Sequence, residues 1–261
     1  MGWNVVTSVT PMEAQNFNYE TTPDYDKRYA RAAEHIDVVK ALWDSWADDA
    51  FVNDRPSGLY YRPEARRVLA HEGSHFKVRG PLNVARSPQG QPVIVQAGAS
   101  EAGRSLAARS AELVFTAQPT LAAAQAFYAD LKYRAEAAGR SRNAIKILPG
   151  AFVIVGDSLD EAKEKRARLD SLVSYDSGIA ALSIAIGQDA RAFDPDGPLP
   201  EIPETNASKS GRERVVALAQ REKLTVRQIA GRLGGYGGLA MMGTPAMIAD
   251  QMEEWFTTGA C

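Results

Sequence analysis

The sequence predicts an α/β protein built on a parallel sheet with helices outside it. Strand-like and helix-like segments alternate along most of the chain and are joined by short turns. The β-branched run at 93–95 leads through small residues into a helix that begins at a serine, which is typical of a βα unit. A chain of 261 residues can form one large domain, and an α/β barrel is about this size.

The first part of the chain predicts one strand and one long helix before the pattern becomes irregular. Residues 3–8 are expected to form a strand. Residues 26–48 are expected to form an amphipathic helix, because their apolar positions recur near helical spacing. Residues 49–91 predict an irregular excursion with a polar loop and a short strand at 76–79.

Regular alternation resumes with the apolar run at 93–95, which predicts a strand buried on both faces. A helix over 101–110 and a strand over 113–116 follow. Thr120 is the expected N-cap of a helix that runs to about residue 138. We expect these strands, with those at 3–8 and near 147, to be adjacent and parallel, the first strand lying next to 93–95.

The next segment predicts a strand over 145–155 that is interrupted near Pro149. Ser158 and Glu161 have the spacing of a capping box, which would open a helix reaching about residue 173. The pattern then fails again between residues 175 and 238.

Within this second irregular region, residues 194–203 must form an extended loop, because prolines at that density forbid both helix and sheet. Helices are expected near 211–222 and 225–232, followed by a flexible glycine-rich turn at 234–238.

The strand count is too low for a closed barrel. The sequence contains five candidate strands, whereas a (β/α)₈ barrel needs eight. The chain begins almost inside a strand, and its last helix, capped by Thr244 with Pro245 behind it, ends at about residue 258. We therefore expect the chain to be a piece of a larger fold; a small open sheet with long insertions is the alternative.

Composition excludes some classes of partner. The formal charge is −2 and the pI is near 6, so nothing in the charge balance favours nucleic acid or acidic lipid. The single cysteine, Cys261, cannot form an internal disulfide. The longest apolar run, at 178–187, is far shorter than a membrane span. These features predict a soluble cytoplasmic protein that binds neither nucleic acid nor membranes.

The turn after the strand at 93–95 can seat a phosphate. Gly98 and Ala99 would let a ligand approach the backbone closely. Ser100 can cap the next helix while the first amides of that helix stay free to bind an anion. The alternative is an ordinary βα turn with a serine cap.

A second motif, His71-Glu72-Gly73-Ser74-His75, has the spacing of the zinc-protease signature. That signature requires a helix, so that both histidines face one metal while the glutamate activates its water. Here a β-type run begins directly after the motif, and no third ligand is defined. A zinc metallohydrolase using His71, Glu72 and His75 is thus a remote alternative, and we expect a loop without converging rings.

Several stretches, in the right order along essentially the whole chain, resemble the bacterial luciferase-like flavin-dependent monooxygenases. The similarity is to the branch with nitrilotriacetate monooxygenase, dibenzothiophene-sulfone monooxygenase and the pristinamycin synthase large subunit. The matching stretches are Trp-Asn-Val-Val-Thr-Ser at 3–8, Pro-Asp-Tyr-Asp-Lys-Arg-Tyr at 23–29, Val-Arg-Gly-Pro-Leu-Asn at 78–83, Gln-Pro-Val-Ile-Val-Gln-Ala-Gly-Ala-Ser at 91–100, Val-Phe-Thr-Ala-Gln-Pro at 114–119, Gly-Pro-Leu-Pro at 197–200, Glu-Thr-Asn at 204–206, Gly-Thr-Pro at 243–245 and Glu-Trp at 254–255.

The resemblance implies a (β/α)₈ TIM barrel of the luciferase type that is incomplete in this chain. By comparison with the longer family members, residues 1–261 would be one partial barrel domain covering about strands four to seven. It would be truncated at both ends, with insertions at about 49–91 and 175–238.

The resemblance also implies the cofactor site. In this family the positions of Tyr29 and Ser100 contact flavin mononucleotide (FMN), Ser100 through the phosphate, and Ala99 lies beside it. Asn4 and Thr7 match strand positions near the flavin ring. The family usually has histidine at the position of Tyr25, so a donor near the cofactor is altered; tyrosine can still donate but does not titrate near neutral pH.

The activity implied is a monooxygenase that uses reduced FMN and dioxygen on a small organic substrate. A separate NADH:FMN oxidoreductase would supply the reduced flavin, and the chain could form a homo-oligomer. No residue is assigned as a catalytic acid or base. The alternative within the same family is a truncated remnant that has lost catalysis.

Overall fold

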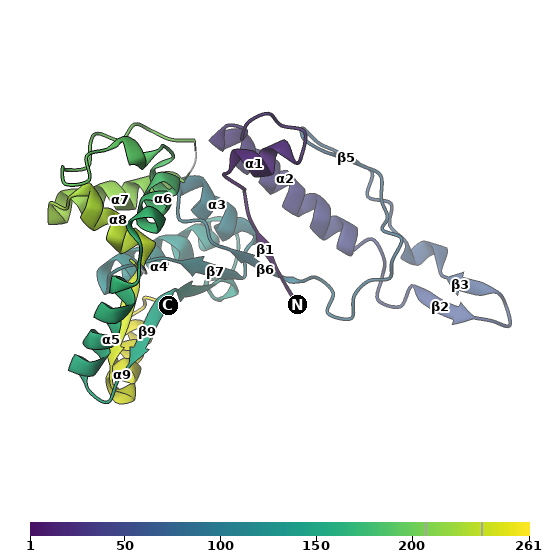
Figure 1. The fold of residues 1–261 in the computed structure, drawn as a ribbon. Helices are drawn as coiled ribbons and strands as arrows, with labels where there is room; N and C mark the ends of the chain where they lie inside the picture. The colour runs from purple at the N-terminus through teal and green to yellow at the C-terminus, as the bar shows by residue number, and fades with distance from the viewer. Residues whose placement is uncertain (207, 236) are drawn as a thin grey trace.

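The computed structural model describes residues 1–206, 208–235 and 237–261. At its centre is a four-stranded sheet of order β1-β6-β7-β8 in which all neighbours are parallel (Figure 1). The strands are β1 (Gly2–Val5), β6 (Val93–Gln96), β7 (Leu113–Thr116) and β8 (Lys146–Pro149). The predicted order and direction of these strands are confirmed, although β1 ends earlier than residue 8.

Three helices cover one face of this sheet: α2 (Tyr25–Trp43), α3 (Glu101–Ser110) and α4 (Leu121–Ala137). Apolar side chains of the strands and helices form a common core between the two layers. The bounds of α3 were predicted correctly, and those of α4 to within a residue. Helix α2 stops short of residue 48, because the chain turns at Asp44 and the Ser45 hydroxyl donates to the carbonyl of Leu42.

The other face of the sheet is not buried. Ile94 on β6 and Val114 on β7 point into the core and are 2% and 0% exposed, whereas Phe115 and Leu148 on the opposite face are 49% and 47% exposed. The prediction that 93–95 is buried on both faces is therefore wrong. The helices lie on one side, and only Ile94 of the three is fully buried.

A second parallel pair, β9 (Ala151–Val155) with β10 (Leu239–Gly243), continues the α/β pattern. The predicted interruption near Pro149 is a real boundary, since β8 and β9 belong to different sheets. The strand β10 was not predicted, because its short run Leu-Ala-Met-Met-Gly has no alternation. Helices α5 (Leu159–Ser171) and α9 (Pro245–Thr257) accompany this pair.

Side-chain caps begin most of these helices as their sequences predict. The hydroxyls of Ser100, Thr120, Ser158 and Thr244 each accept from an amide in the first turn. The predicted capping box at Ser158 is only half formed, because the Glu161 carboxylate accepts from the amide of Asp157 instead of that of Ser158.

A compact helical unit follows, made of α6 (Tyr175–Ile186), α7 (Lys209–Glu222) and α8 (Val226–Gly234), with the 3₁₀ turn η3 (Ala190–Ala192). The prediction that regular structure ends at 175 is wrong, since α6 begins there. Ile179, Leu182 and Ile186 recur at helical spacing and are buried. Helix α7 starts two residues before the expected 211, and the predicted turn at 234–238 contains Tyr236, which lies outside the described residues.

The excursion between α2 and β6 contains more regular structure than predicted. It holds two antiparallel hairpins, β2 (Phe51–Asp54) with β3 (Leu59–Tyr61) and β4 (His71–Glu72) with β5 (Lys77–Val78). The predicted strand at 76–79 is β5. Figure 1 shows the β2–β3 hairpin at the end of the molecule away from α6–α8. The short elements α1 (Pro11–Gln15), η1 (Pro63–Ala65) and η2 (Arg142–Ala144) complete the fold.

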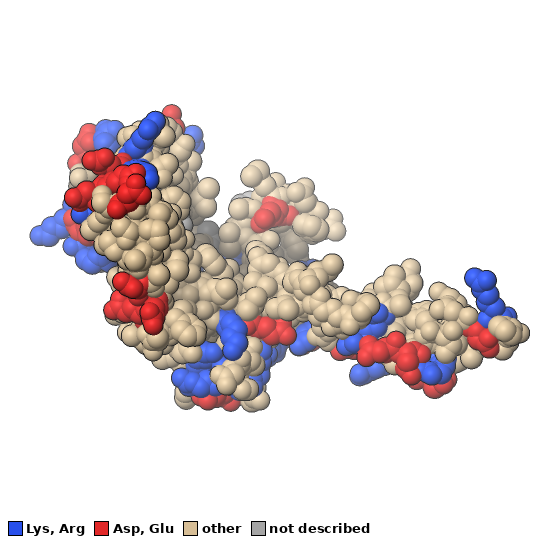
Figure 2. All heavy atoms as spheres, turned by 90° about the horizontal axis from the view of Figure 1, so that it is seen from below, with Lys and Arg blue, Asp and Glu red and all other residues tan. Residues whose placement is uncertain are grey.

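Acidic and basic side chains form only small groups on the face shown in Figure 2, in agreement with the small net charge. Within the described ranges, no single helix is long and apolar enough to cross a membrane. The pair α5 and α6 meets that test only jointly, by length and composition, and is bent by 86° between its helices.

Candidate functional site

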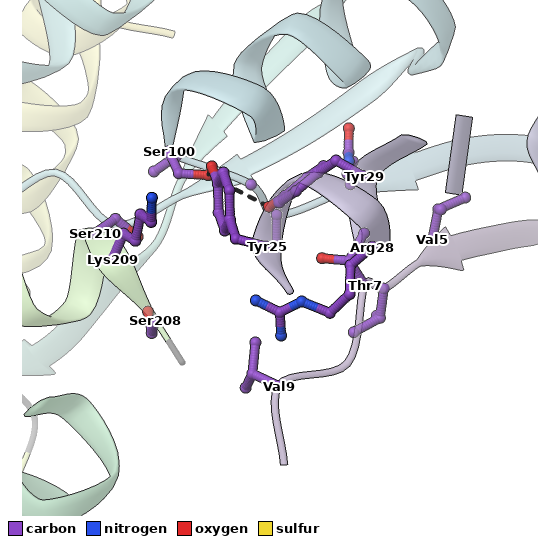
Figure 3. Close-up of a pocket in the computed structure, with 15 residues that line it drawn as sticks. Val5, Thr7, Val9, Tyr25, Arg28, Tyr29, Ser100, Ser208, Lys209 and Ser210 are labelled. Atoms are coloured by element: carbon purple, nitrogen blue, oxygen red, sulfur yellow. Dashed lines mark hydrogen bonds between the residues drawn. The ribbon is translucent and has the colours of Figure 1, made fainter. Parts of the chain in front are cut away.

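A small cavity of about 170 Å³ lies where β1 and β6 end, beside the first turn of α2 (Figure 3). None of the described residues that line it is acidic, and two are basic. The lining residues are Val5, Val6, Thr7, Val9, Tyr25, Arg28, Tyr29, Gln96, Ala97, Gly98, Ala99, Ser100, Ser208, Lys209 and Ser210. The ends of parallel strands are where α/β folds bind ligands.

Ser100 stands at the N-terminus of α3, as predicted. Its hydroxyl accepts from the amide of Gly103 at 3.3 Å, which leaves the first two amides of the helix without a partner inside it. Gly98 serves the turn itself, since a Cβ there would lie 2.8 Å from the Cα of Gly103. The close packing of these two glycines lets the helix start directly behind the strand.

Two tyrosines from the first turns of α2 reach the same serine. The Tyr25 hydroxyl donates to Ser100 Oγ at 2.6 Å, and the Tyr29 hydroxyl lies 3.3 Å from it. The two rings pack at 4.8 Å between centroids, because residues four apart share one face of a helix. Tyr25 therefore supplies a phenol donor at the position where histidine was expected.

Two buried polar side chains of the cavity lack part of their hydrogen bonding. Arg28 is 8% exposed; it donates to the carbonyls of Ser8 and Asn206, but its Nε has no partner and it forms no salt bridge with a described residue. Gln96 is 4% exposed, and its Oε1 has no partner. Burial lowers the pKa of the Arg28 guanidinium, while the neighbouring Tyr29 and Tyr25 raise it. Buried groups of this kind usually find a partner, so a ligand is the natural one.

Helix α7 contributes the opposite wall of the cavity. Ser208 caps this helix by accepting from the amide of Gly211 at 3.1 Å, and Lys209 and Ser210 are its first residues. Figure 3 shows these three residues on one side of the cavity, with Arg28, Tyr29 and Thr7 on the other. Sequence reasoning missed this wall along with Arg28 and Gln96. The only available signal was the place of Arg28 three residues after Tyr25, on the same helical face.

A larger cavity of about 600 Å³ adjoins the small one, and the two share Val5, Val6, Thr7 and Arg28. Asn4 lines this larger cavity and not the small one, while Thr7 lines both. The structure thus brings Thr7, Tyr25, Tyr29, Ala99 and Ser100 together and sets Asn4 apart in the neighbouring cavity.

The zinc motif does not have the geometry that its chemistry requires. His71 and Glu72 form β4, and His75 lies in the turn before β5, so the motif is a hairpin and not a helix. His71 Nε2 instead pairs with the carboxylate of Glu34 on α2 at 2.9 Å. Among the described residues, no group of three His, Cys, Asp or Glu side chains could hold a metal. The metallohydrolase alternative is therefore abandoned.

These features define an α/β protein with a cavity at the ends of its parallel strands, lined by two basic and, among the described residues, no acidic side chains. The family model "Luciferase-like monooxygenase" matches residues 1–261. The chain belongs to this family, and within it to the branch of nitrilotriacetate monooxygenase.

Individual relatives are similar over almost the whole chain. Component A of nitrilotriacetate monooxygenase from Aminobacter aminovorans is 51% identical over 97% of this chain and 57% of its own length. N-acetyl-S-(2-succino)cysteine monooxygenase from Bacillus subtilis (strain 168) is 43% identical, with coverages of 100% and 60%. The solved structure of a riboflavin lyase with modified FMN and riboflavin superposes with a TM-score of 0.86 at 28% identity, covering 99% of this chain and 57% of that one. The chain thus spans less than two thirds of the length of these relatives.

Proposed function

We propose that the protein is the oxygenase component of a two-component system that uses reduced FMN and dioxygen to oxidise a small organic substrate. The family and the two monooxygenases named above support this class of reaction. A separate NADH:FMN oxidoreductase would supply the reduced flavin, and a reducing cytoplasm would suit both partners. The central sheet and the β9–β10 pair would be part of a (β/α)₈ barrel, and assembly into a homo-oligomer stays a prediction.

The observation that carries the proposal is the small cavity, because its unsatisfied groups match the phosphate end of FMN. Arg28 is buried without a carboxylate partner among the described residues, and the N-cap of α3, Ser100, lines the same cavity. A helix N-terminus is a favourable place for a phosphate. Ser100, Tyr25 and Tyr29 would hold the phosphate oxygens. Gln96 Oε1 is an acceptor, so a ribityl hydroxyl would satisfy it.

The larger cavity would take the flavin ring. At about 170 Å³ the small cavity suits a phosphate and not a ring system, whereas the adjoining 600 Å³ lies within the range of ligand pockets. Thr7 would bridge the two parts of the ligand, and Asn4 would hydrogen-bond the polar edge of the ring. When bound, reduced FMN supplies the reaction with dioxygen. The residues of this chain bind and orient it and keep water away.

Titration of the purified chain with FMN tests the proposal. Replacing Ser100 by alanine removes a hydroxyl at the phosphate, and we expect FMN affinity to fall roughly ten- to a hundred-fold, the value of one hydrogen bond to a charged acceptor. Ser158→Ala is the matched control, since it removes the same kind of helix cap far from the cavity.

Equal FMN affinity in the Ser100→Ala and Ser158→Ala proteins would overturn the phosphate site. Flavin binding without oxygen-dependent product formation, in the presence of a flavin reductase and candidate amino-polycarboxylate substrates, would overturn the oxygenase activity and leave a flavin-binding remnant.

A further inference from the structure

Helix α7 places a positive charge beside the small cavity from a distant part of the chain. Lys209 is its first residue, and its Nζ lies 4.3 Å from the centroid of the Tyr25 ring. Lys209 is half-buried and forms no salt bridge with any residue that the structure describes. Its ammonium group lies over the ring of the tyrosine that donates to Ser100.

The segment that leads into α7 is tied to the start of α2. Arg28 Nη2 donates to the carbonyl of Asn206 at 2.6 Å, across 178 residues of sequence. The side-chain Nδ2 of Asn206 in turn donates to the carbonyls of Thr22 and Pro23, each at 3.2 Å. These bonds hold the approach to α7 against the cavity, so the lysine does not depend on a free loop for its position.

Each of the two walls of the cavity contains the N-terminus of a helix capped by a serine. Ser100, the N-cap of α3, lines the cavity, as do Ser208, Lys209 and Ser210 at the start of α7, and each helix N-terminus carries a partial positive charge. The buried Arg28, with its unpartnered Nε, and Lys209 add two formal charges, and none of the described residues that line the cavity is acidic. This excess of positive charge suits a phosphate monoester, which carries nearly two negative charges at neutral pH.

We propose that Lys209, with the N-terminus of α7, closes a second side of the phosphate clamp and is the residue that makes the protein select FMN over riboflavin. This inference rests on the proposed flavin function. Ser100 and Arg28 contact the phosphate from one wall. Lys209 neutralises it from the other and couples the helical unit α6–α8 to cofactor binding.

The test compares FMN and riboflavin binding by fluorescence titration in wild-type, Lys209→Gln and Lys209→Arg proteins. We expect Lys209→Gln to weaken FMN binding about five- to thirty-fold, the size of one charge-assisted contact. Riboflavin binding should stay unchanged, and Lys209→Arg should keep most of the preference. Lys223→Gln is the control, because it removes a lysine from the other end of the same helix.

Unchanged FMN affinity in Lys209→Gln, or equal weakening of FMN and riboflavin, would overturn the inference. The wild-type protein separates this failure from that of the proposed function. If wild type binds FMN and riboflavin equally, the phosphate site itself fails. If wild type prefers FMN and Ser100→Ala reduces that preference while Lys209→Gln does not, only the role of Lys209 fails.

Discussion

Two polar clusters lie along helix α2, one around Glu34 and one around Arg28, and they differ in whether all of their buried polar atoms have hydrogen-bond partners within the protein. At the β4–β5 hairpin the Glu34 carboxylate accepts from His71 Nε2 and from the amides of His75 and Phe76, at 2.8–2.9 Å. In the small cavity, one to two turns earlier, Arg28 Nε and Gln96 Oε1 have no partner. The first cluster is satisfied within the protein, whereas the second leaves polar atoms without a partner, which is why we propose a ligand there.

The contacts of the β4–β5 hairpin with α2 give the residues of the His71–His75 motif a structural role. Hydrogen bonding with His71, then with the amides of His75 and Phe76, holds the pKa of Glu34 below its ordinary value, against the opposing effect of burial. The ring centroids of Phe76 and His35 lie 5.5 Å apart, and the Arg31 guanidinium carbon lies 4.8 Å from the centroid of the Phe76 ring. The two histidines are thus parts of a hairpin that docks on α2.

The largest effect on FMN affinity should come from Arg28→Met, which replaces the buried guanidinium by an apolar side chain of similar length. FMN affinity should fall roughly ten- to a hundred-fold, because a buried cation is lost from the phosphate. The free energy of unfolding should fall by only about 1–3 kcal/mol, because the carbonyls of Ser8 and Asn206 lose their donor while an unpaired buried charge is removed.

Arg109→Met is the control for that change. Arg109 also donates to a backbone carbonyl of α2, that of Ala33, but it lies away from the cavity. Titration with FMN measures the affinity of each variant, and thermal unfolding measures its stability. A large loss of stability with FMN affinity intact would show that Arg28 is a structural bridge to Ser8 and Asn206.

The reverse pattern is expected for Glu34→Ala. Three donors lose their acceptor, so the unfolding temperature should fall by a few degrees while FMN affinity stays the same. Glu72→Ala, an exposed glutamate on the same hairpin, should leave both unchanged. If Glu34→Ala weakened FMN binding and left the unfolding temperature unaltered, the Glu34 cluster would not be purely structural and the two clusters would not differ in role.

The smallest effect should be a dependence of hairpin stability on pH. The pKa of Glu34 is lowered in the folded protein, so its stabilising contribution is fully present above the pKa of an unfolded glutamate and is lost as the pH falls through the lower pKa of the folded state. The difference in unfolding temperature between wild type and Glu34→Ala should therefore narrow between pH 6 and pH 3.5. A constant difference over that range would mean that the carboxylate charge does not matter.

Local signals account for the elements that were predicted well. Strand β7 was placed by its apolar run, and helices α3 and α4 by their caps Ser100 and Thr120, whose partners lie three residues away. Helix α6 was missed although Ser174 caps it and Ile179, Leu182 and Ile186 recur at helical spacing, because the positions between them are also largely apolar. Strand β10 was missed because its short apolar run does not alternate.

The residues of the candidate site likewise fall into those that local sequence signals could identify and those that they could not. The sequence by itself determined the parallel strands β1, β6, β7 and β8, the helices α3 and α4 and the serine at the start of α3, because these depend on interactions within a few residues. The tyrosines at the start of α2 were assigned through the family resemblance. Only the tertiary structure decided which polar groups meet. Tyr25 reaches Ser100 across 75 residues, and Arg28 reaches Asn206 across 178. Contacts at that separation depend on how the layers pack, and no local periodicity or cap encodes them.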